Sequence, residues 1–287
     1  MKKSFHSLVV CAFVVTAMIF LNLEVVGAQV KEVTFAMDWM INGSHAPYFV
    51  AVEKGFYKDA GLKVEIVRGY GTGDTVKKVA SKNAAFGVAD FAGLVGSVVR
   101  ENTPVKAVAA VYGRAMLGLL YLKESGIKSP KDIEGRKIAR SASGASVLMF
   151  PAFIKANNLD RSKMTEVVVD AASFLPMLLS RQVDAVLEQS VHQGRFQKAA
   201  EEGGQKVTVR AMLYSDFGLE TYGNVILAQN DLIEKDPSLV KNLVQASLRG
   251  LAYSFDHPDE AISILAKTNP QVTQERAIEE LIAVKET

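Results

Sequence analysis

From about residue 31 onward, short apolar runs and amphipathic runs alternate along the chain. Residues 31–37 predict a strand, and residues 62–68 alternate with the period of two that is typical of a half-buried strand. Residues 84–89 and 105–112 predict further strands, and amphipathic segments such as 73–82 predict helices between them. Strands separated by helices of about ten residues indicate an α/β fold with a parallel sheet.

The alternation begins again in the middle of the chain. After a turn-rich stretch, strands are predicted at 136–140, 165–169, 183–188 and 205–213, with a helix over 144–157. This second series of strands and helices predicts a second α/β lobe.

Two long apolar segments, near 117–124 and 222–229, separate the two series. Beyond the second segment the pattern predicts helices only. The chain therefore predicts two lobes joined by two crossover strands, with lobe 1 built from 29–120 and 225–287 and lobe 2 from 121–224. Two crossovers make a hinge, and the cleft between the lobes is where a small ligand would be enclosed.

The first 28 residues have the pattern of a secretory signal peptide. A basic start (MKKSFHS) precedes an apolar stretch that is short for a membrane span, and Val26 and Ala28 provide a small-residue cleavage site before Gln29. The alternative is an uncleaved N-terminal anchor. Cleavage would remove the single cysteine, Cys11, so we expect an exported, most simply periplasmic, protein without disulfides.

Composition narrows the class of partner. A hydrophobic content of 49% and a charged content of 22% are those of an ordinary globular protein. The 33 basic and 31 acidic residues give a net charge of +2, with no run of five or more Lys and Arg. Nothing in this balance indicates a nucleic-acid-binding surface, and we expect a monomer that needs no cofactor.

The loop after the first predicted strand carries the most chemistry. Trp39, the only tryptophan, is followed by Asn42 and His45. In α/β sheets, ligands bind at the carboxyl ends of strands, next to helix N-termini. An aromatic ring, an amide and an imidazole together suit a flat, nitrogen-containing ring, through stacking and hydrogen bonds. The alternative is that Trp39 packs between sheet and helix while His45 caps backbone.

Two further loops precede predicted helices. The glycine-rich GYGTGDTV contains Gly71 and Thr72, and the serine-rich SASGASV contains Ser143 and Ser146. Free N–H groups at a helix start can hold an anion, and hydroxyls can bind polar groups. The same residues are equally consistent with a simple turn and with helix caps.

Asp90, Glu188 and Tyr222 are weaker candidates for the same site. Asp90 and Glu188 each follow a predicted strand, and Tyr222 begins the second crossover segment. A carboxylate in such a position can pair with a ring amine or a ring N–H.

Catalytic patterns are weak. His45, His192 and His257 are far apart in the sequence and lack metal-ligand spacing. The chain has no G-x-S-x-G motif, and its only cysteine lies in the leader. We expect His192 and His257 to be solvated. The sequence therefore predicts no catalytic and no metal-binding residues, and a protein that is not an enzyme.

Five segments resemble, in order, the solute-binding proteins of the thiamine-pyrimidine, alkanesulfonate and nitrate group: DWMINGSHAPYFVAVEKGFYKDAGLKVEI, GTGDTVKKVASKNAAFGVAD, SGIKSPKDIEGRKIA, LLSRQVDAVLEQ and YGNVILAQNDLIEKDPSLVKNLVQA. The resemblance covers nearly all of 31–270, and its first segment is similar to the branch that binds the thiamine pyrimidine precursor. It implies a type II periplasmic-binding-protein fold and an ABC importer, with a membrane permease and its ATPase as partners. The ligand stays open between a pyrimidine or flavin-like ring and an alkanesulfonate, taurine or nitrate anion. Members of this group usually continue beyond the point where this sequence ends.

The same branch contains a fungal enzyme that makes the thiamine pyrimidine from pyridoxal phosphate and a histidine of its own chain, with iron. The resemblance puts Ala89 where that enzyme has its Schiff-base lysine, and Gly93 where it has the donor histidine. The enzyme's cysteine-rich segment has no counterpart here. Without the lysine no Schiff base forms, so the sequence favours a binding protein over the synthase.

Overall fold

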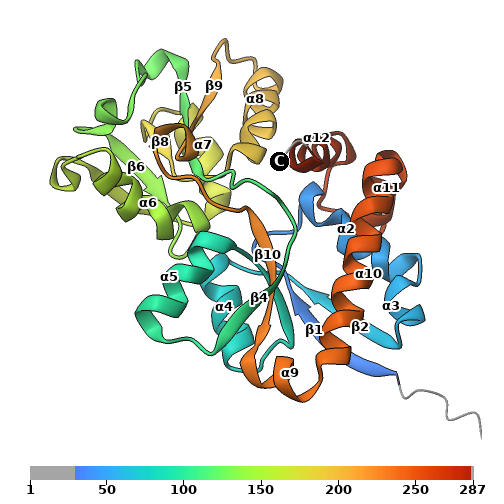
Figure 1. Ribbon diagram of the computed structural model, residues 1–287. Helices are drawn as coiled ribbons and strands as arrows, with labels where there is room; N and C mark the ends of the chain where they lie inside the picture. The colour runs from blue at the N-terminus through green and yellow to red at the C-terminus, as the bar shows by residue number, and fades with distance from the viewer. Residues whose placement is uncertain (1–29, 286–287) are drawn as a thin grey trace, which may run out of the picture. The chain divides into compact units, whose positions relative to one another are not determined.

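A computed structural model describes residues 30–285, in which two five-stranded sheets form the centres of two lobes (Figure 1). The first lobe is built on the sheet β2-β1-β3-β10-β4, and the second on β7-β6-β8-β5-β9. The strands are β1 Lys31–Ala36, β2 Leu62–Val67, β3 Phe86–Asp90, β4 Val105–Ala110, β5 Gly118–Leu122, β6 Lys137–Arg140, β7 Thr165–Val168, β8 Ala185–Val186, β9 Val209–Leu213 and β10 Asn224–Gln229. The predicted α/β class is confirmed.

Both sheets are mixed, whereas the sequence predicted parallel pairing. β1 runs parallel to β3, with Phe35 opposite Phe86, but β10 is antiparallel to both β3 and β4. β10 returns from the second lobe and starts where β3 ends, with Asn224 opposite Asp90, so it runs in the other direction. β5 is likewise antiparallel to β8 and β9.

Helices cover both faces of the first sheet. Val33 and Phe35 of β1 pack in one cluster with α2 and α10, and Met37, directly after β1, packs there too. Ala36 packs with α4 on the opposite face, because successive side chains of a strand point to opposite sides. Within the described residues the helices are α2 Ala46–Glu53, α3 Phe56–Asp59, α4 Thr72–Ala80, α5 Phe91–Glu101, α6 Ala145–Ala156, α7 Phe174–Leu179, α8 Gln193–Glu202, α9 Asn230–Lys235, α10 Pro237–Asp256, α11 Pro258–Thr268 and α12 Gln274–Lys285. Two short 3₁₀ turns, η1 Gly43–His45 and η6 Ser190–His192, belong to the site described below.

The second sheet is covered in the same way. Ile138 of β6 packs with Phe150 and Phe153 of α6. Its neighbour Ala139 faces the other side, where Phe174 of α7 and the helix α8 pack. Each lobe therefore has its own apolar layers on both sides of its sheet.

Two segments join the sheets, residues 111–117 before β5 and residues 214–223 before β10. β5 pairs with β9 from Gly118 onward, and every residue of β5 and of β10 is buried. The long apolar runs near 117–124 and 222–229 thus correspond to inner strands covered on both faces, and the connections precede them.

Within residues 30–285, no helix has both the length and the apolarity that a bilayer span requires. The predicted signal peptide, residues 1–28 with Cys11, lies outside the described residues.

Candidate ligand-binding site

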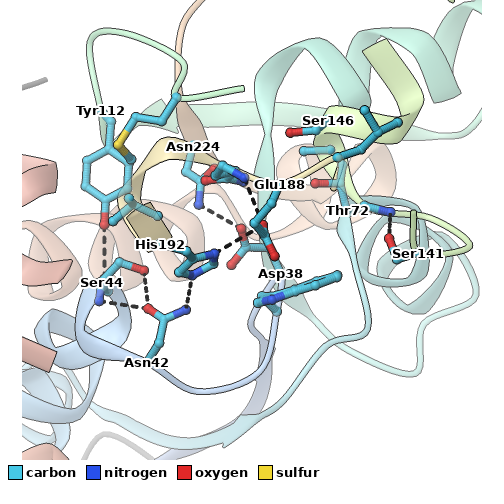
Figure 2. A pocket seen from close by; sticks show the side chains of 17 residues that line it. Asp38, Asn42, Ser44, Thr72, Tyr112, Ser141, Ser146, Glu188, His192 and Asn224 are labelled. Carbon is cyan, nitrogen blue, oxygen red and sulfur yellow. Dashed lines mark hydrogen bonds and ion pairs between the residues drawn. The ribbon is translucent and has the colours of Figure 1, made fainter. Parts of the chain in front are cut away.

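A cavity lies between the two lobes, beyond the carboxyl end of β1 and at the amino end of β10 (Figure 2). The first lobe contributes Asp38, Trp39 and Asn42 to its lining, and the second lobe contributes Ser146 and Glu188. The cavity volume is about 30 Å³. Since a single water needs about 10–15 Å³, the cavity has room for only two or three water molecules.

Asp38 is a buried carboxylate that protein donors hold from two sides. His45 Nε2 lies 2.8 Å from Asp38 Oδ1, and Asn224 Nδ2 donates to Oδ2 at 2.9 Å. The backbone N–H of Asn42 donates to His45 Nδ1, so the imidazole proton belongs on Nε2 and points at Asp38. His45 therefore lies behind Asp38, where it orients the carboxylate.

The amide of Asn42 has its orientation fixed by its own loop. Its Oδ1 accepts the N–H of Ser44 at 2.9 Å and the Ser44 hydroxyl at 2.7 Å. Its Nδ2 donates to Met40 O at 3.2 Å and lies 3.4 Å from Nε2 of His192, across the cleft. The first lobe thus presents an amide donor to an imidazole of the second lobe.

His192 is buried, so the prediction that it is solvated was wrong; His257 is exposed, as predicted. Figure 2 shows the His192 ring between the Asn42 amide and the Glu188 carboxylate. Because Asn42 donates to Nε2, a neutral His192 carries its proton on Nδ1, which lies 3.1 Å from Glu188 Oε1 at an angle too oblique for a good hydrogen bond. The turn η6 places this ring one helical turn after Glu188 and thereby buries it.

Glu188 supplies a second buried carboxylate. Its Oε1 accepts the Gln189 N–H at 2.8 Å, and its Oε2 has no hydrogen-bond partner within residues 30–285. Burial alone would raise its pKa, but His192, Arg195 and the Gln189 N–H outweigh burial and lower the pKa of Glu188 below its usual value. Glu188 is therefore an anion at neutral pH with one oxygen free to accept a hydrogen bond.

The cavity combines aromatic and hydroxyl groups around these carboxylates. Trp39 lines it, and the indole Nε1–H is buried without an acceptor in the described part of the chain. Three lining hydroxyls each accept one backbone N–H, which leaves the hydroxyl hydrogen available for donation. They are Thr72, bonded to Asp90 N–H at 3.2 Å, Ser141, bonded to Gly144 N–H at 3.0 Å, and Ser146, bonded to Gly118 N–H at 3.2 Å.

The helix α12 buttresses the loop that carries Asn42. The buried Glu280 accepts the Gly43 N–H at 2.8 Å. A Cβ at Gly43 would lie 1.8 Å from the carbonyl oxygen of Ala277, so glycine is required for this approach of backbone to backbone. The loop is therefore held rigidly from its outer side.

Five of the ten predicted site residues line this cavity: Trp39, Asn42, Thr72, Ser146 and Glu188. The other five lie apart from it. His45 stands behind Asp38, Asp90 caps α5 through the Gly93 N–H, and Tyr222 is exposed with its ring edge-on to Phe91.

Gly71 and Ser143 meet each other where the two lobes touch. A Cβ on Gly71 would lie 2.5 Å from Ser143 O, and the Gly73 N–H donates to the same oxygen at 3.3 Å. The Ser143 hydroxyl also donates to Tyr70 O at 3.1 Å. Gly71 and Ser143 therefore tie the two lobes together, whereas their neighbours Thr72 and Ser141 line the cavity.

Asp90 has the most perturbed carboxyl of this region. Burial raises its pKa to about 7, assisted by the negative charge of Asp38 and opposed by the N–H groups of Gly93 and Ala92. Asp90 thus contributes little negative charge in mildly acidic solution, although it lies beside the site.

The sequence reasoning did not identify several of the lining residues, notably Ser44, Tyr112 and His192. The signal for His192 was present, because Glu188 and His192 are four residues apart directly after a predicted strand. Tyr112 donates to Ser44 O at 3.0 Å and gave no such signal, because it comes from the connection between the sheets.

The chain has the fold of periplasmic binding proteins. The structure of the alkanesulfonate-binding protein SsuA of Xanthomonas axonopodis pv. citri, bound to MOPS, matches with a TM-score of 0.68 over 88% of this chain and 83% of that one. The sequence identity is 12%, so the similarity defines the fold and not the ligand. The fold that the sequence resemblance implied is confirmed.

The chain belongs to the NMT1/THI5-like family, which it matches over residues 42–261. It is 30% identical over 250 residues to the riboflavin-binding protein RibY of Chloroflexus aurantiacus, covering 84% of this chain and 67% of that protein. It is 26% identical over 249 residues to the 4-amino-5-hydroxymethyl-2-methylpyrimidine phosphate synthase of Legionella pneumophila, covering 84% and 75%. The relatives thus include proteins named for binding and for synthesis.

Proposed function

We propose that this protein captures a small heteroaromatic solute bearing N–H donors between its two lobes and delivers it to a membrane permease of an ABC importer. The observation that carries this proposal is the cavity in which Trp39 lies with the buried carboxylates of Asp38 and Glu188. Ring stacking on the indole and donation of a ring N–H or amine to Glu188 Oε2 are the contacts that such a lining offers.

The same lining disfavours an anionic ligand. Among residues 30–285, those that line the cavity include no lysine and no arginine, whereas Asp38 and Glu188 are both acidic. A sulfonate or nitrate would enter a buried site of like charge and would lose its hydration without a cationic partner. The alkanesulfonate, taurine and nitrate alternatives are therefore less favoured than a pyrimidine or flavin-like ring.

Binding requires the lobes to move apart. A benzene-sized ligand needs a cavity of about 150 Å³, which is far more than the 30 Å³ present here. Contacts of Ser143 with Tyr70 and Gly73 hold the lobes in the closed arrangement. The solute enters an open form and selects a form closed around it, because only there do both lobes contact it.

The synthase named among the relatives is the second candidate. In its favour is the sequence identity to the Legionella enzyme. Against it, Ala89 is a fully buried strand residue, and Gly93 lies in α5 where the resemblance expects the donor histidine. In the part of the chain that the structure describes, no lysine lines the cavity. If pyridoxal phosphate formed a borohydride-trappable Schiff base with the native protein, the synthase would displace the binding proposal.

The role in import is part of the same proposal. It is supported by the fold, by the expected signal peptide and by the relative named as a binding protein. In this proposal the protein works as a monomer in the periplasm and docks on the permease after closing.

Ligand screening tests the proposal directly. Thermal unfolding and tryptophan fluorescence would be measured with 4-amino-5-hydroxymethyl-2-methylpyrimidine, riboflavin, taurine and nitrate. A ligand at a hundredfold excess over its Kd stabilises by about 2.7 kcal/mol, which is a rise in Tm of about 5–10 °C for a protein of this size. Trp39 is the only tryptophan, so a stacked ring should also change the fluorescence of the whole protein.

A ring compound should give both signals, and the Trp39→Phe variant should give only the thermal shift, with weaker binding. Stabilisation by taurine or nitrate, with no response to either ring, would overturn the choice of ligand class.

A further inference from the structure

A second hollow adjoins the cavity, and we call it the side groove. The first lobe lines it with Trp39, Met40, Arg68 and Tyr70, and the second lobe with Ser141, Ala142 and residues 168–171. Trp39 and Ser141 line both the cavity and the side groove, so the two spaces are neighbours across these side chains.

The volumes of the two spaces differ by an order of magnitude. The side groove measures about 380 Å³, against about 30 Å³ for the cavity. A space of about 150 Å³ is enough for one six-membered ring. The side groove therefore has room for a second ring or a planar substituent while the first ring reaches Glu188.

The lining of the side groove suits a flat group that carries acceptor oxygens. The Arg68 guanidinium stacks on the Tyr70 ring, 4.3 Å from its centroid, and no carboxylate of the described residues lies within ion-pairing distance of Arg68. The Tyr70 N–H donates to Asp74 at 3.0 Å, and Asp170, also in the lining, accepts the Ala172 N–H at 2.9 Å through one of its two oxygens. A planar guanidinium with open donors is well suited to carbonyl or carboxylate oxygens.

We propose that the side groove is a second subsite for the same ligand, and that the natural solute is larger than a single ring. Its N–H-donor ring lies at Trp39 and Glu188, and a fused or linked second ring with carbonyl or carboxylate oxygens lies against Tyr70 and Arg68. The proposal rests on the binding function proposed above and adds the size and polarity of the ligand.

The test uses three probes that grow by one part at a time: isocytosine, pterin and pterin-6-carboxylate. Isocytosine is the single aminopyrimidinone ring, pterin adds the second ring, and the carboxylate adds the anionic oxygens. Affinities would be measured by calorimetry on the full chain. We expect pterin to bind about three- to tenfold more tightly than isocytosine through ring stacking, and the carboxylate to add about fivefold through Arg68.

Two variants assign these increments to residues. Arg68→Met should remove the increment from the carboxylate, and Tyr70→Leu should reduce the increment from the second ring. Neither should change the affinity for isocytosine by more than about twofold, because neither residue lines the cavity. The matched control is Arg249→Met, since Arg249 stacks on Phe56 at the same 4.3 Å but lies outside the side groove.

The outcomes separate the two proposals. If isocytosine binds but the larger probes bind no better, or if Arg68→Met leaves the carboxylate increment intact, the subsite is refuted and the binding function stands. If none of the three probes binds, the donor-ring proposal fails, and the subsite that rests on it fails as well.

Discussion

The substitution Glu188→Gln removes the negative charge of Glu188, whose Oε2 faces the ligand without a partner among residues 30–285, and keeps the size of the side chain. Glu188 Oε1 accepts the Gln189 N–H at 2.8 Å, so the amide of the variant will keep its oxygen at that position. Its NH₂ group then lies where Oε2 accepted the ligand. A donor would face a donor, and the ligand amine would be left without a partner.

The loss can be estimated from this geometry. A hydrogen bond to a charged group contributes about 1.5–3 kcal/mol, which corresponds to a Kd about 10- to 150-fold weaker. The free protein should unfold at a slightly lower temperature, because the lowered pKa of Glu188 means that its ionised form stabilises the folded state at neutral pH, while the bond to Gln189 is retained.

The assay is a titration followed by Trp39 fluorescence, with a thermal melt of the unliganded variant alongside. The control is Glu65→Gln, which makes the same chemical change at an exposed position of β2. A Kd for the ring ligand within twofold of that of the parent, in a variant that melts normally, would refute the assignment of Glu188 as the acceptor.

Two further predictions concern the frame around the site. Gly43→Ala places a Cβ against Ala277 O and should destabilise the protein by about 1–3 kcal/mol, which lowers Tm by about 3–10 °C. The control is Gly96→Ala, whose Cβ meets only the end of the Arg100 side chain and which should be neutral or stabilising. Equal melting temperatures for the two variants would contradict the contact between Gly43 and Ala277. The pKa of Asp90 is about 7 in the folded protein, above the value of about 3.9 for an unfolded aspartate. Between these two values the folded protein keeps a proton that the unfolded chain releases. The stability contributed by protonated Asp90 is therefore lost as the pH rises from about 4 to 7. Asp90→Asn keeps an oxygen for the Gly93 N–H and should therefore raise Tm over the parent at pH 8 but not at pH 4; a gain independent of pH, or one matched by the exposed Asp259→Asn, would contradict the assignment.

The sequence predicted the two lobes and the first loop because both depend on local patterns. Period-two strands and the run from Trp39 to His45 can be identified without tertiary information. Sheet direction could not be predicted in this way, since β10 is antiparallel only because the chain returns from the other lobe. The sequence predicted that His45 binds the ligand and that His192 is solvated, and both depend on contacts between distant parts of the fold. His45 instead bonds to Asp38 behind the site, and the turn η6 brings His192 against Asn42, 150 residues away in the chain.

Helix α12 contacts both lobes, and some of these contacts are ion pairs that make solute retention sensitive to salt. Its Glu280 is fixed to the first lobe through Gly43, while Glu275 pairs with Lys198 at 2.6 Å and Arg276 with Glu202 at 2.7 Å, both on α8 of the second lobe. If the lobes separate to admit solute, these two ion pairs break, at about 0.2–1 kcal/mol each in water. Dissolved salt screens such pairs, so ionic strength should shift the protein toward its open form and weaken retention even of an uncharged solute.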